Sequence, residues 1–367
     1  MKIIRNKCVI CDGDNLSVFL QYRMPVYNSD TPYNENFKVS DIKFSECLDC
    51  NVVQLKEFVE PEIVYQFNHN REIVGPTWLD HYDQFKDFIS DVENKNVLEI
   101  SDPVAKVAKK FTNYNKWFIV EPHLSLTIDD SKIHFIDEFF DDNFTIKHKI
   151  DIIVHSHFFE HTLKPSSFLD KCNELLEIGG LMYISTPNLK SILNINNNPN
   201  NILHFEHTFY FDENIVEYLA NKSGFRVNRI LEFKKHSLFI ELEKISSPLI
   251  NLLVQKFDRN SLIFLKSYNN YKKIIETINL SKDRYILFGC HVSSQFLIYN
   301  GLDVNKIDYI IDNSPSKQNN FLYGTNILTY SPNKITEDSL IIVSHMGIYA
   351  DEIKEGLLKI KKDIKFI

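Results

Sequence analysis

The stretch Asn96-Val-Leu-Glu-Ile100 begins a series of short apolar segments that decides the fold. Four similar segments follow it, separated by longer mixed stretches: Lys116–Val120, Ile133–Ile136, Asp151–His155 and Leu181–Ser185. Such segments are typical of strands buried on both faces, which alternate with helices in parallel sheets. Between the last two, Lys164–Glu177 carries apolar residues at helical spacing and is predicted to be a helix. The sequence therefore predicts an α/β fold with a doubly wound parallel sheet.

A helix and two further strands are predicted to follow this sheet. Asp212–Ser223 has helical spacing, with Asp212 as a suitable N-cap and Gly224 as its stop. The next two segments, Arg226–Glu232 and Ser237–Glu243, alternate and are predicted to pair as antiparallel strands. Before the sheet, residues 61–92 are predicted to be helical because apolar residues recur at helical spacing: Leu79, Tyr82, Phe85, Phe88 and Ile89.

A second alternation of strands and helices occupies the C-terminal part of the chain. Residues 247–280 are predicted to form a long helical connection. After it we expect one helix, Val292–Asn300, closed by Gly301, and three strands: Tyr285–Phe288, Asp308–Ile311 and Leu340–Val343. We therefore predict a small module in residues 1–60, a central domain in 61–246 and a C-terminal α/β domain in 247–367.

The overall totals fit a globular protein that handles small ligands. The chain has 367 residues, a hydrophobic fraction of 44% and a net charge of −8. It contains no long run of like charges, so a nucleic-acid surface is not expected. No apolar run approaches the ~18 residues that a membrane span needs. The N-terminus has no apolar core segment of the secretory type, so we expect a cytoplasmic protein; the oligomeric state is not predicted.

Four cysteines in the first module form two C-x-x-C pairs. Cys8 and Cys11 are the first pair, and Cys47 and Cys50 the second. This spacing lets two thiolates on one tight turn reach the same ion, and two such turns complete a tetrahedron around zinc. The alternative is one redox-active pair with two buried thiols. Because a module this small has little core, we favour zinc, with a structural role, since four thiolates leave no open coordination position.

Polar residues follow the predicted strands of the central sheet. The carboxyl ends of parallel strands form the ligand-binding edge of open α/β sheets, and an acidic residue after the second strand commonly binds ribose hydroxyls. Taken singly, Glu99 and Glu121 also fit ordinary strand-end charges. The candidate cofactor-binding residues are, in chain order, Glu99, Ser101, Asp102, Glu121, Pro122, Asp137, Ser156, His157 and His161.

Together these segments resemble class I S-adenosylmethionine (SAM) dependent methyltransferases. Val97-Leu-Glu-Ile100 looks like the first motif of that family, and Glu121 falls where its ribose-binding acid is expected. Residues 151–161 and 176–188 resemble its fourth-strand and fifth-strand motifs. The resemblance implies a Rossmann-like central domain with SAM as cofactor.

The plan of the whole chain resembles, more narrowly, the nucleotide-sugar C-methyltransferases. These combine an N-terminal double C-x-x-C module, a methyltransferase domain and a second Rossmann-like domain. Thr77-Trp-Leu-Asp-His81 resembles a helix start of the family, and residues 312–318 with 323–326 resemble its C-terminal domain. Leu203-His-Phe-Glu-His207 resembles its Tyr-His-Glu-His active-site segment. The resemblance implies a nucleotide-linked ketosugar as the small-molecule partner.

On that resemblance, three residues are candidates for catalysis. Methylation at a carbon beside a carbonyl needs a base for the α-proton and a group that stabilises the enolate. His207 would be the base and Glu206 its partner, while His204, which stands where the family has a tyrosine, would polarise the ketone. The alternatives are a solvated loop without chemistry and a metal site.

The loop after the first strand departs from the family pattern. Residues 101–105 are Ser-Asp-Pro-Val-Ala, whereas the family has glycines that let the backbone approach the cofactor. The family's Tyr- and Ser-rich motif is also absent, with residues 66–75 in its place and Tyr65 nearby. Two other functions therefore stay open: methyl transfer to a sugar oxygen or nitrogen, and a non-catalytic binding protein descended from such an enzyme.

Overall fold

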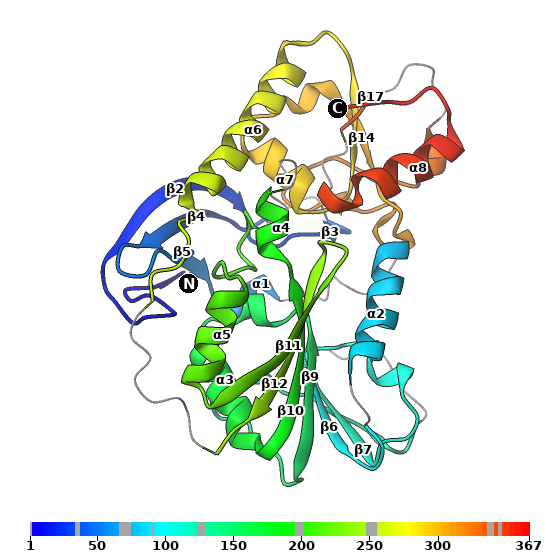
Figure 1. Ribbon diagram of the computed structural model, residues 1–367. Coiled ribbons are helices and arrows are strands. Elements are labelled where there is room, and N and C mark those ends of the chain that lie inside the picture. Colours follow the sequence, from blue (N-terminus) through cyan, green and yellow to red (C-terminus); the bar gives the residue numbers. More distant parts are fainter. Residues whose placement is uncertain are drawn as a thin grey trace.

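The computed structural model describes nine stretches of the chain, residues 2–33, 37–65, 75–89, 92–122, 130–194, 202–246, 255–335, 341–343 and 347–367. They form three main sheets, and Figure 1 shows the N-terminal strands beside a central sheet, with the C-terminal elements above both. Several predicted features extend beyond these stretches: most of residues 66–75, the asparagine-rich loop after Asn194, the start of the 247–280 connection, and Leu340.

The central sheet has seven strands in the order β11-β12-β10-β9-β6-β7-β8. Its parallel part comprises β6 (Asn96–Ile100), β7 (Lys116–Val120), β8 (Ile133–Ile136), β9 (Ile150–Ser156) and β10 (Leu176–Pro187). The hairpin of β11 (Phe225–Phe233) and β12 (Ser237–Lys244) adds the antiparallel edge. In chain order the parallel strands run 3-2-1-4-5, the doubly wound order, and its switch point lies between β6 and β9. The predicted α/β class and the first three strands are confirmed.

Helices cover both faces of this sheet. Helices α3 (Pro165–Leu175) and α5 (Glu213–Lys222) lie on one face and α2 (Pro76–Phe88) on the other (Figure 1). Asp212 caps α5 as predicted, because its carboxylate accepts from the amide of Ile215 at 3.1 Å. The expected helix in residues 61–92 is interrupted: a short α1 (Pro61–Val64) precedes α2. Leu79 does not belong to the buried face of α2, since 56% of it is exposed.

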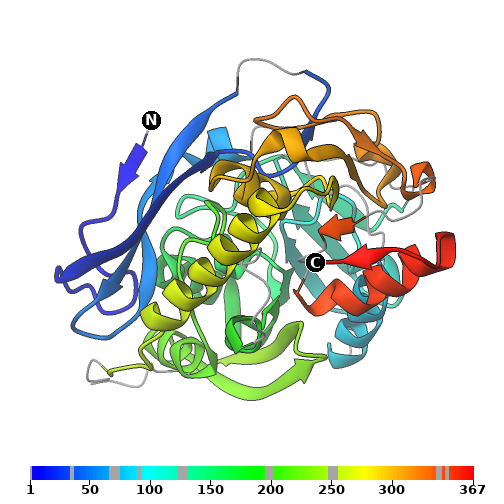
Figure 2. The same cartoon turned by 90° about the horizontal axis from the view of Figure 1, so that it is seen from above.

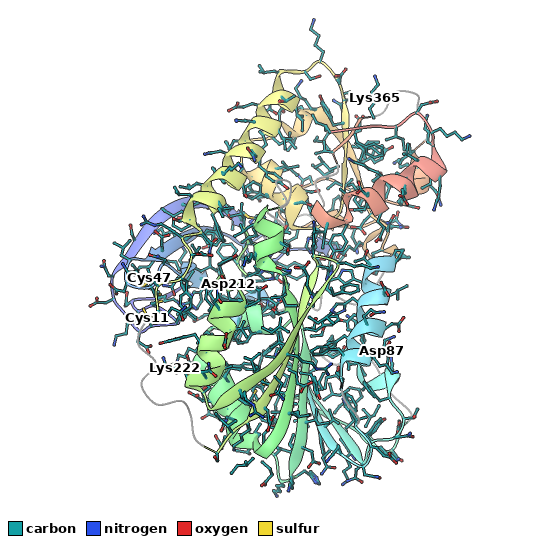
Figure 3. The ribbon with its side chains drawn as sticks, viewed as in Figure 1. Cys11, Cys47, Asp87, Asp212, Lys222 and Lys365 are labelled. Atoms are coloured by element: carbon teal, nitrogen blue, oxygen red, sulfur yellow. The ribbon has the colours of Figure 1, made fainter. Side chains whose placement is uncertain are left out.

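The first module is a four-stranded antiparallel sheet in the order β1-β5-β4-β2. Its strands are β1 (Lys2–Ile4), β2 (Leu16–Pro25), β4 (Val39–Cys47) and β5 (Val53–Val59). The two cysteine pairs lie on the turns at one end of these strands. On α5, Lys222 donates to the carbonyl of Ile10 at 3.4 Å and to Asp12 at 3.2 Å, so this end contacts the central domain (Figure 3).

The C-terminal part forms a five-stranded parallel sheet in the order β16-β14-β13-β17-β18. Its strands are β13 (Tyr285–Phe288), β14 (Ile307–Ile311), β16 (Thr329–Tyr330), β17 (Ile341–Val343) and β18 (Lys365–Phe366). The helices of this part are α6 (Ser261–Leu280), α7 (Val292–Tyr299) and α8 (Ala350–Ile360). Figure 2 shows α6 lying between the N-terminal strands and this sheet. The division into three domains at residues 60 and 246 stays a prediction, as does a Rossmann-like C-terminal domain.

Short pairings connect the three parts. β3 (Asp30–Thr31) pairs with β15 (Phe321–Leu322), and the α4 helix (Leu189–Asn194) precedes the segment that reaches the first module. In that segment the carbonyl of Thr208 accepts a hydrogen bond from the amide of Leu55 in β5 at 2.9 Å. No helix of the described stretches is long and apolar enough to cross a membrane.

Arg5 reinforces this connection from within the protein. It is buried, and its guanidinium donates to three carbonyls: those of Leu55 at 3.1 Å, Thr208 at 2.8 Å and Leu163 at 2.8 Å. Its forked geometry lets one side chain serve acceptors on both the first module and the central domain. Arg5 therefore holds the segment that contains Thr208 next to strand β5.

We expect Arg5→Lys to lower the free energy of unfolding by about 2 kcal/mol, because a lysine cannot satisfy all three carbonyls. Urea unfolding of both proteins measures the difference. Arg23→Lys, on the exposed face of β2, is the matched control and should change stability by less than about 0.5 kcal/mol. Equal effects of the two substitutions would contradict this role of Arg5.

Candidate functional site

A cavity of about 880 Å³ lies where the three parts of the chain meet. Its lining comes from the carboxyl ends of β6, β7 and β9, from the region of Tyr65, from residues 204–208, and from the loops after β13 and β14. Ligand pockets commonly span about 300–1,000 Å³, so this one is large enough for a small-molecule ligand. The carboxyl ends of parallel strands from two sheets thus meet at one space.

The glycine-free loop after β6 adopts the backbone conformation that glycine favours. Ser101 has φ 61° and Ala105 has φ 53°, both in the left-handed region. A residue with a Cβ atom is strained there by about 1 kcal/mol or more. The carboxylate of Asp102 offsets part of this strain by accepting from the amides of Val104 and Lys106. The loop contains no glycine, yet it is tight and strained where it borders the cavity.

Glu121 follows β7 and is the buried acid at this end of the cavity. Its Oε2 lies 3.3 Å from the hydroxyl of Ser101, which donates to it. Ser101, Asp102, Glu121 and Pro122 all line the cavity, so the structure brings these four candidate residues together.

Two of the candidate cofactor-binding residues lie elsewhere. Glu99 is 1% exposed and does not line the cavity; its Oε2 accepts from Trp117 Nε1 at 2.7 Å and from the amide of Ala108 at 3.2 Å. Burial, and then the charge of Asp102, raise the pKa of its carboxyl. Glu99 thus supports the turn beneath the loop. Asp137 is exposed and also lies outside the lining.

The candidate catalytic segment lines the cavity opposite the strained loop. His204, Glu206 and His207 all face this space. The ring of His204 lies 4.4 Å from that of His207, and Glu206 Oε1 accepts from Asn28 Nδ2 at 2.8 Å. Burial and then the charge of His207 hold the pKa of His204 well below its usual value. Its Nδ1 accepts from the amide of Glu206 at 3.2 Å, which leaves the proton of the neutral ring on Nε2 as a donor.

Glu160 supplies a second carboxylate beside these histidines. It is 1% exposed, and one of its oxygens lies within 4.8 Å of a ring nitrogen of His161 and of His207. Burial alone would raise its pKa, but the hydrogen bond from His157 and the neighbouring histidine charges lower it to about 2. Thr186 Oγ1 also donates to it at 3.1 Å. A carboxylate kept ionised in this position favours positive charge on the rings around it.

Tyr65 closes the same side of the cavity. Its hydroxyl lies 2.9 Å from His161 Nδ1, and burial followed by the charge of Glu206 raises its pKa well above the usual value. Tyr65 therefore stays protonated and can donate. His161, the last candidate residue of the β9 motif, meets this hydroxyl and the carboxylate of Glu160 rather than the loop after β6.

Ser156 and His157 lie at the end of β9 and line the cavity. His157 has φ 53°, and its amide donates to the carbonyl of Ser185 at 2.7 Å. Its ring turns toward Trp78 on α2, with ring centroids 4.7 Å apart. The indole of Trp78 and the ring of Tyr82 stack at 6.1 Å and form an aromatic wall of the cavity.

The C-terminal sheet contributes the upper part of the lining. Asp312, after β14, braces its loops: Oδ2 accepts from the amide of Cys290 and Oδ1 from the amide of Ser314, both at 2.8 Å. The lining residues on this side include Gly289, His291, Asn313 and Lys317. This side therefore offers a glycine turn and a cation at the carboxyl ends of parallel strands.

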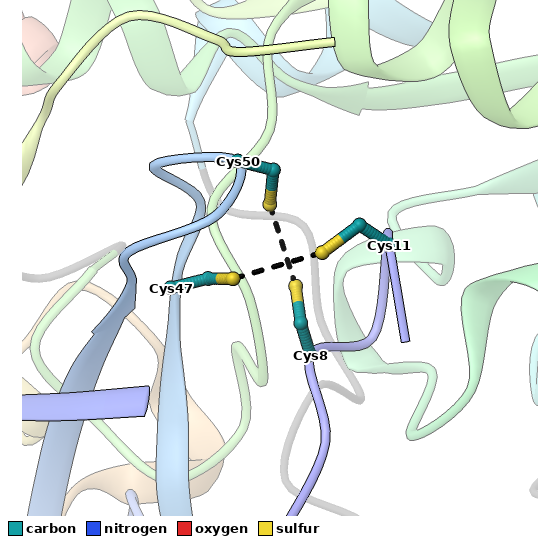
Figure 4. Close-up of side chains that lie close together, drawn as sticks. All are labelled: Cys8, Cys11, Cys47 and Cys50. Atoms are coloured by element: carbon teal, nitrogen blue, oxygen red, sulfur yellow. Dashed lines mark hydrogen bonds between the residues drawn. The ribbon is translucent and has the colours of Figure 1, made fainter. Parts of the chain in front are cut away.

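The four cysteines of the first module lie apart from the cavity. The sulfur atoms of Cys8 and Cys50 are 3.5 Å apart and those of Cys11 and Cys47 3.6 Å apart, and all four lie within 4.8 Å of one another (Figure 4). Sulfur atoms around tetrahedral zinc are separated by about 3.8 Å. The hydrogen bond from Cys50 lowers the pKa of Cys8 to about 6, which favours a thiolate. The donor set fits a structural zinc ion.

Sequence reasoning missed several residues of the cavity. Glu160 was visible between His157 and His161 but had no distinguishing signal of its own. Lys317 was part of the quoted segment 312–318 but had no signal of its own. Asn28, which does not line the cavity but bonds Glu206 there, is far from every motif in sequence. Trp78 was part of a quoted helix start, yet nothing in its spacing indicated that it lines a ligand site.

We expect the Ser101→Gly variant to be more stable than Ser101→Ala by about 1 kcal/mol, because both lose the bond to Glu121 but only glycine relieves the left-handed strain. Chemical unfolding of the pair measures this difference. Ser223, with φ −94°, provides the control pair, in which alanine should be the more stable variant. Glycine that is no better than alanine at residue 101 would contradict the loop conformation.

Comparison with known proteins gives a limited result. No model of a known protein family matches the chain, and no curated protein matches it. Solved structures that match include an S-adenosylmethionine dependent methyltransferase from Mesorhizobium loti, with 9% identity and a TM-score of 0.36 over 44% of this chain and 96% of that one.

Two other matches were solved with S-adenosylhomocysteine. The N-methyltransferase NodS from Bradyrhizobium japonicum WM9 has 11% identity and a TM-score of 0.35 over 46% of this chain and 88% of that one. The 1,6-didemethyltoxoflavin-N1-methyltransferase from Burkholderia thailandensis has 12% identity and a TM-score of 0.36 over 47% and 82%. These likenesses are too remote to assign a function to the chain.

Proposed function

We propose that this protein is a SAM-dependent methyltransferase that acts on a nucleotide-linked ketosugar, at the carbon beside the ketone. One observation carries the proposal: a strained strand-end loop and the buried acid Glu121 share a single cavity with a group of histidines, a tyrosine and an ionised carboxylate. The resemblance of the motifs to the nucleotide-sugar C-methyltransferases supports the same function.

The residues around β6 and β7 fit the cofactor. Glu121, buried at the end of the second strand, would accept hydrogen bonds from the ribose hydroxyls. The turn at Ser101 and Asp102 would border the methionine end, with Trp78 and Tyr82 offering aromatic faces to a sulfonium cation. When bound there, SAM supplies an electrophilic methyl group. Ser156 and Pro122 complete this side of the cavity.

His207 would act as the general base. It would take the α-proton of the ketosugar onto its ring, and the carboxylate of Glu160 would stabilise the imidazolium formed. The sequence had suggested Glu206 for this partnership; Glu206 accepts from Asn28 and, on the proposal, orients the segment or the sugar. Both carboxylates remain candidates as partners of the base.

His204 and Tyr65 would stabilise the enolate oxygen. His204 is a neutral ring with its proton on Nε2, and Tyr65 is a protonated phenol, so both are donors without positive charge. Donors aimed at a developing oxyanion in a site shielded from water are worth more than in solution. The enolate carbon would accept the methyl group that bound SAM supplies, with S-adenosylhomocysteine as the leaving group.

The C-terminal sheet would hold the nucleotide portion of the substrate. Lys317 and His291 line that side and offer donors to phosphate oxygens, while Gly289 allows close approach to the backbone. We also propose that Cys8, Cys11, Cys47 and Cys50 bind one zinc ion, which replaces the core that a module of residues 1–60 is too small to build.

We expect His207→Gln to reduce turnover at least about 100-fold while SAM affinity is unchanged, because the base does not contact the cofactor. Glu121→Gln should instead weaken SAM binding by about 10–100-fold through loss of a charged acceptor. Calorimetric titration with SAM and mass detection of the methylated product, with a panel of nucleotide-linked ketosugars, separate the two effects. His148→Gln, exposed and outside the cavity, is the control.

Deuterium at the α-carbon of the ketosugar identifies the atom that is methylated. Transfer to carbon loses that deuterium, whereas transfer to oxygen or nitrogen keeps it. Full turnover in His207→Gln would sink the assignment of the base. If the folded wild-type protein has no measurable SAM affinity, the protein is a non-catalytic relative of such enzymes. Its glycine-free loop is compatible with that outcome.

A further inference from the structure

Three histidines from separate parts of the chain meet at the edge of the cavity. His81 lies on α2, His157 follows β9, and His236 lies in the turn between β11 and β12. His81 and His236 are buried, and one nitrogen of each ring lies within 4.8 Å of those of the other two. The motifs single out only His157, as a candidate cofactor-binding residue, and the proposed methyl transfer uses none of the three rings. We call this group the trihistidine cluster.

The spacing of the rings matches that of a metal centre. The ring centroids are 5.3 Å apart for His81 and His157, and 5.5 Å apart for both pairs that include His236. With metal–nitrogen bonds of about 2.0–2.1 Å and tetrahedral angles, the centres of three coordinated rings are roughly 5 Å apart. The three rings therefore have nearly the separation that a bound cation would impose.

Each ring is held by a partner at one nitrogen. His81 Nε2 lies 2.7 Å from Ser185 Oγ, and His236 Nε2 lies 2.6 Å from the hydroxyl of Tyr349. His157 Nδ1 lies 3.3 Å from the carboxylate of Glu160. Histidines that bind metals are oriented in this way, by a hydroxyl, carbonyl or carboxylate on the nitrogen that does not bind.

The opposite nitrogens lack a full set of partners. His157 Nε2 and His236 Nδ1 share one hydroxyl, that of Ser237, at 3.0 and 2.5 Å. His81 Nδ1 is buried and has no hydrogen-bond partner among the described residues. A buried polar atom without a partner costs about 1–3 kcal/mol, so it calls for a ligand.

We propose that His81, His157 and His236 bind a divalent transition-metal cation, with the hydroxyl of Ser237 beside the fourth position. Imidazole nitrogens suit zinc, nickel, cobalt and iron, whereas the four thiolates of the first module prefer softer metal ions. His157 and Tyr349 also line the cavity, so the cation would fix α2, the end of β9 and the region before α8 around the ligand space.

Cobalt(II) distinguishes this site from the cysteine cluster, because only thiolate ligands give an intense charge-transfer absorption. The full-length protein, stripped of metal and dialysed against cobalt, should bind two ions per chain, one of them without a thiolate signature. His81→Gln and His236→Gln should each bind one ion and keep the thiolate band. Cys50→Ser should lose that band and keep the second ion.

Tyr349→Phe removes only an orienting hydroxyl and should lower the affinity for the second ion by about 10–100-fold. His148→Gln is the matched control and should bind two ions. A single cobalt per wild-type chain would overturn the proposal without any variant, and would make the cluster a metal-free hydrogen-bonded group. A second ion that survives in His81→Gln but disappears in His161→Gln would also overturn it, because the ion would then lie with Glu160 and His207.

Discussion

The arrangement of the cavity depends on the pairing of β5 with residues 208–210. The amide of Leu55 donates to Thr208, the amide of Tyr210 donates to Val53 at 2.8 Å, and Arg5 bonds carbonyls on both sides. This pairing fixes the residues just before it, including His207, against the carboxyl end of β9. The first module thus holds the candidate base in position, and the cysteine cluster matters because it holds that module together.

Electrostatics inside the cavity follow from one buried carboxylate. Glu160 is ionised although it is buried, and it faces His157, His161 and His207. Its charge links the proposed base on one side with the trihistidine cluster on the other. In the same space, Glu121 provides another buried acid, next to a loop that is strained without glycine.

The sequence predicted the central sheet well because short apolar segments bounded by polar ones leave little choice of element. Asn96–Ile100, Lys116–Val120 and Ile133–Ile136 are strands with the predicted bounds. Leu79 was misjudged because periodicity does not reveal what covers a helix face. Glu99 and Asp137 lie outside the cavity because strand-end position does not decide the direction of a side chain. Asn28 and Arg5 support the site only through long-range packing, which no local pattern contains.

The central claim is that one cavity binds SAM at the ends of β6 and β7, within reach of His207. A crystal structure of the protein with S-adenosylhomocysteine tests it most directly. The account predicts that the ribose hydroxyls contact the carboxylate of Glu121 and that the sulfur atom faces the side of the cavity formed by His204 and His207. Ligand bound elsewhere, or in this cavity with its sulfur directed away from these histidines, would contradict it.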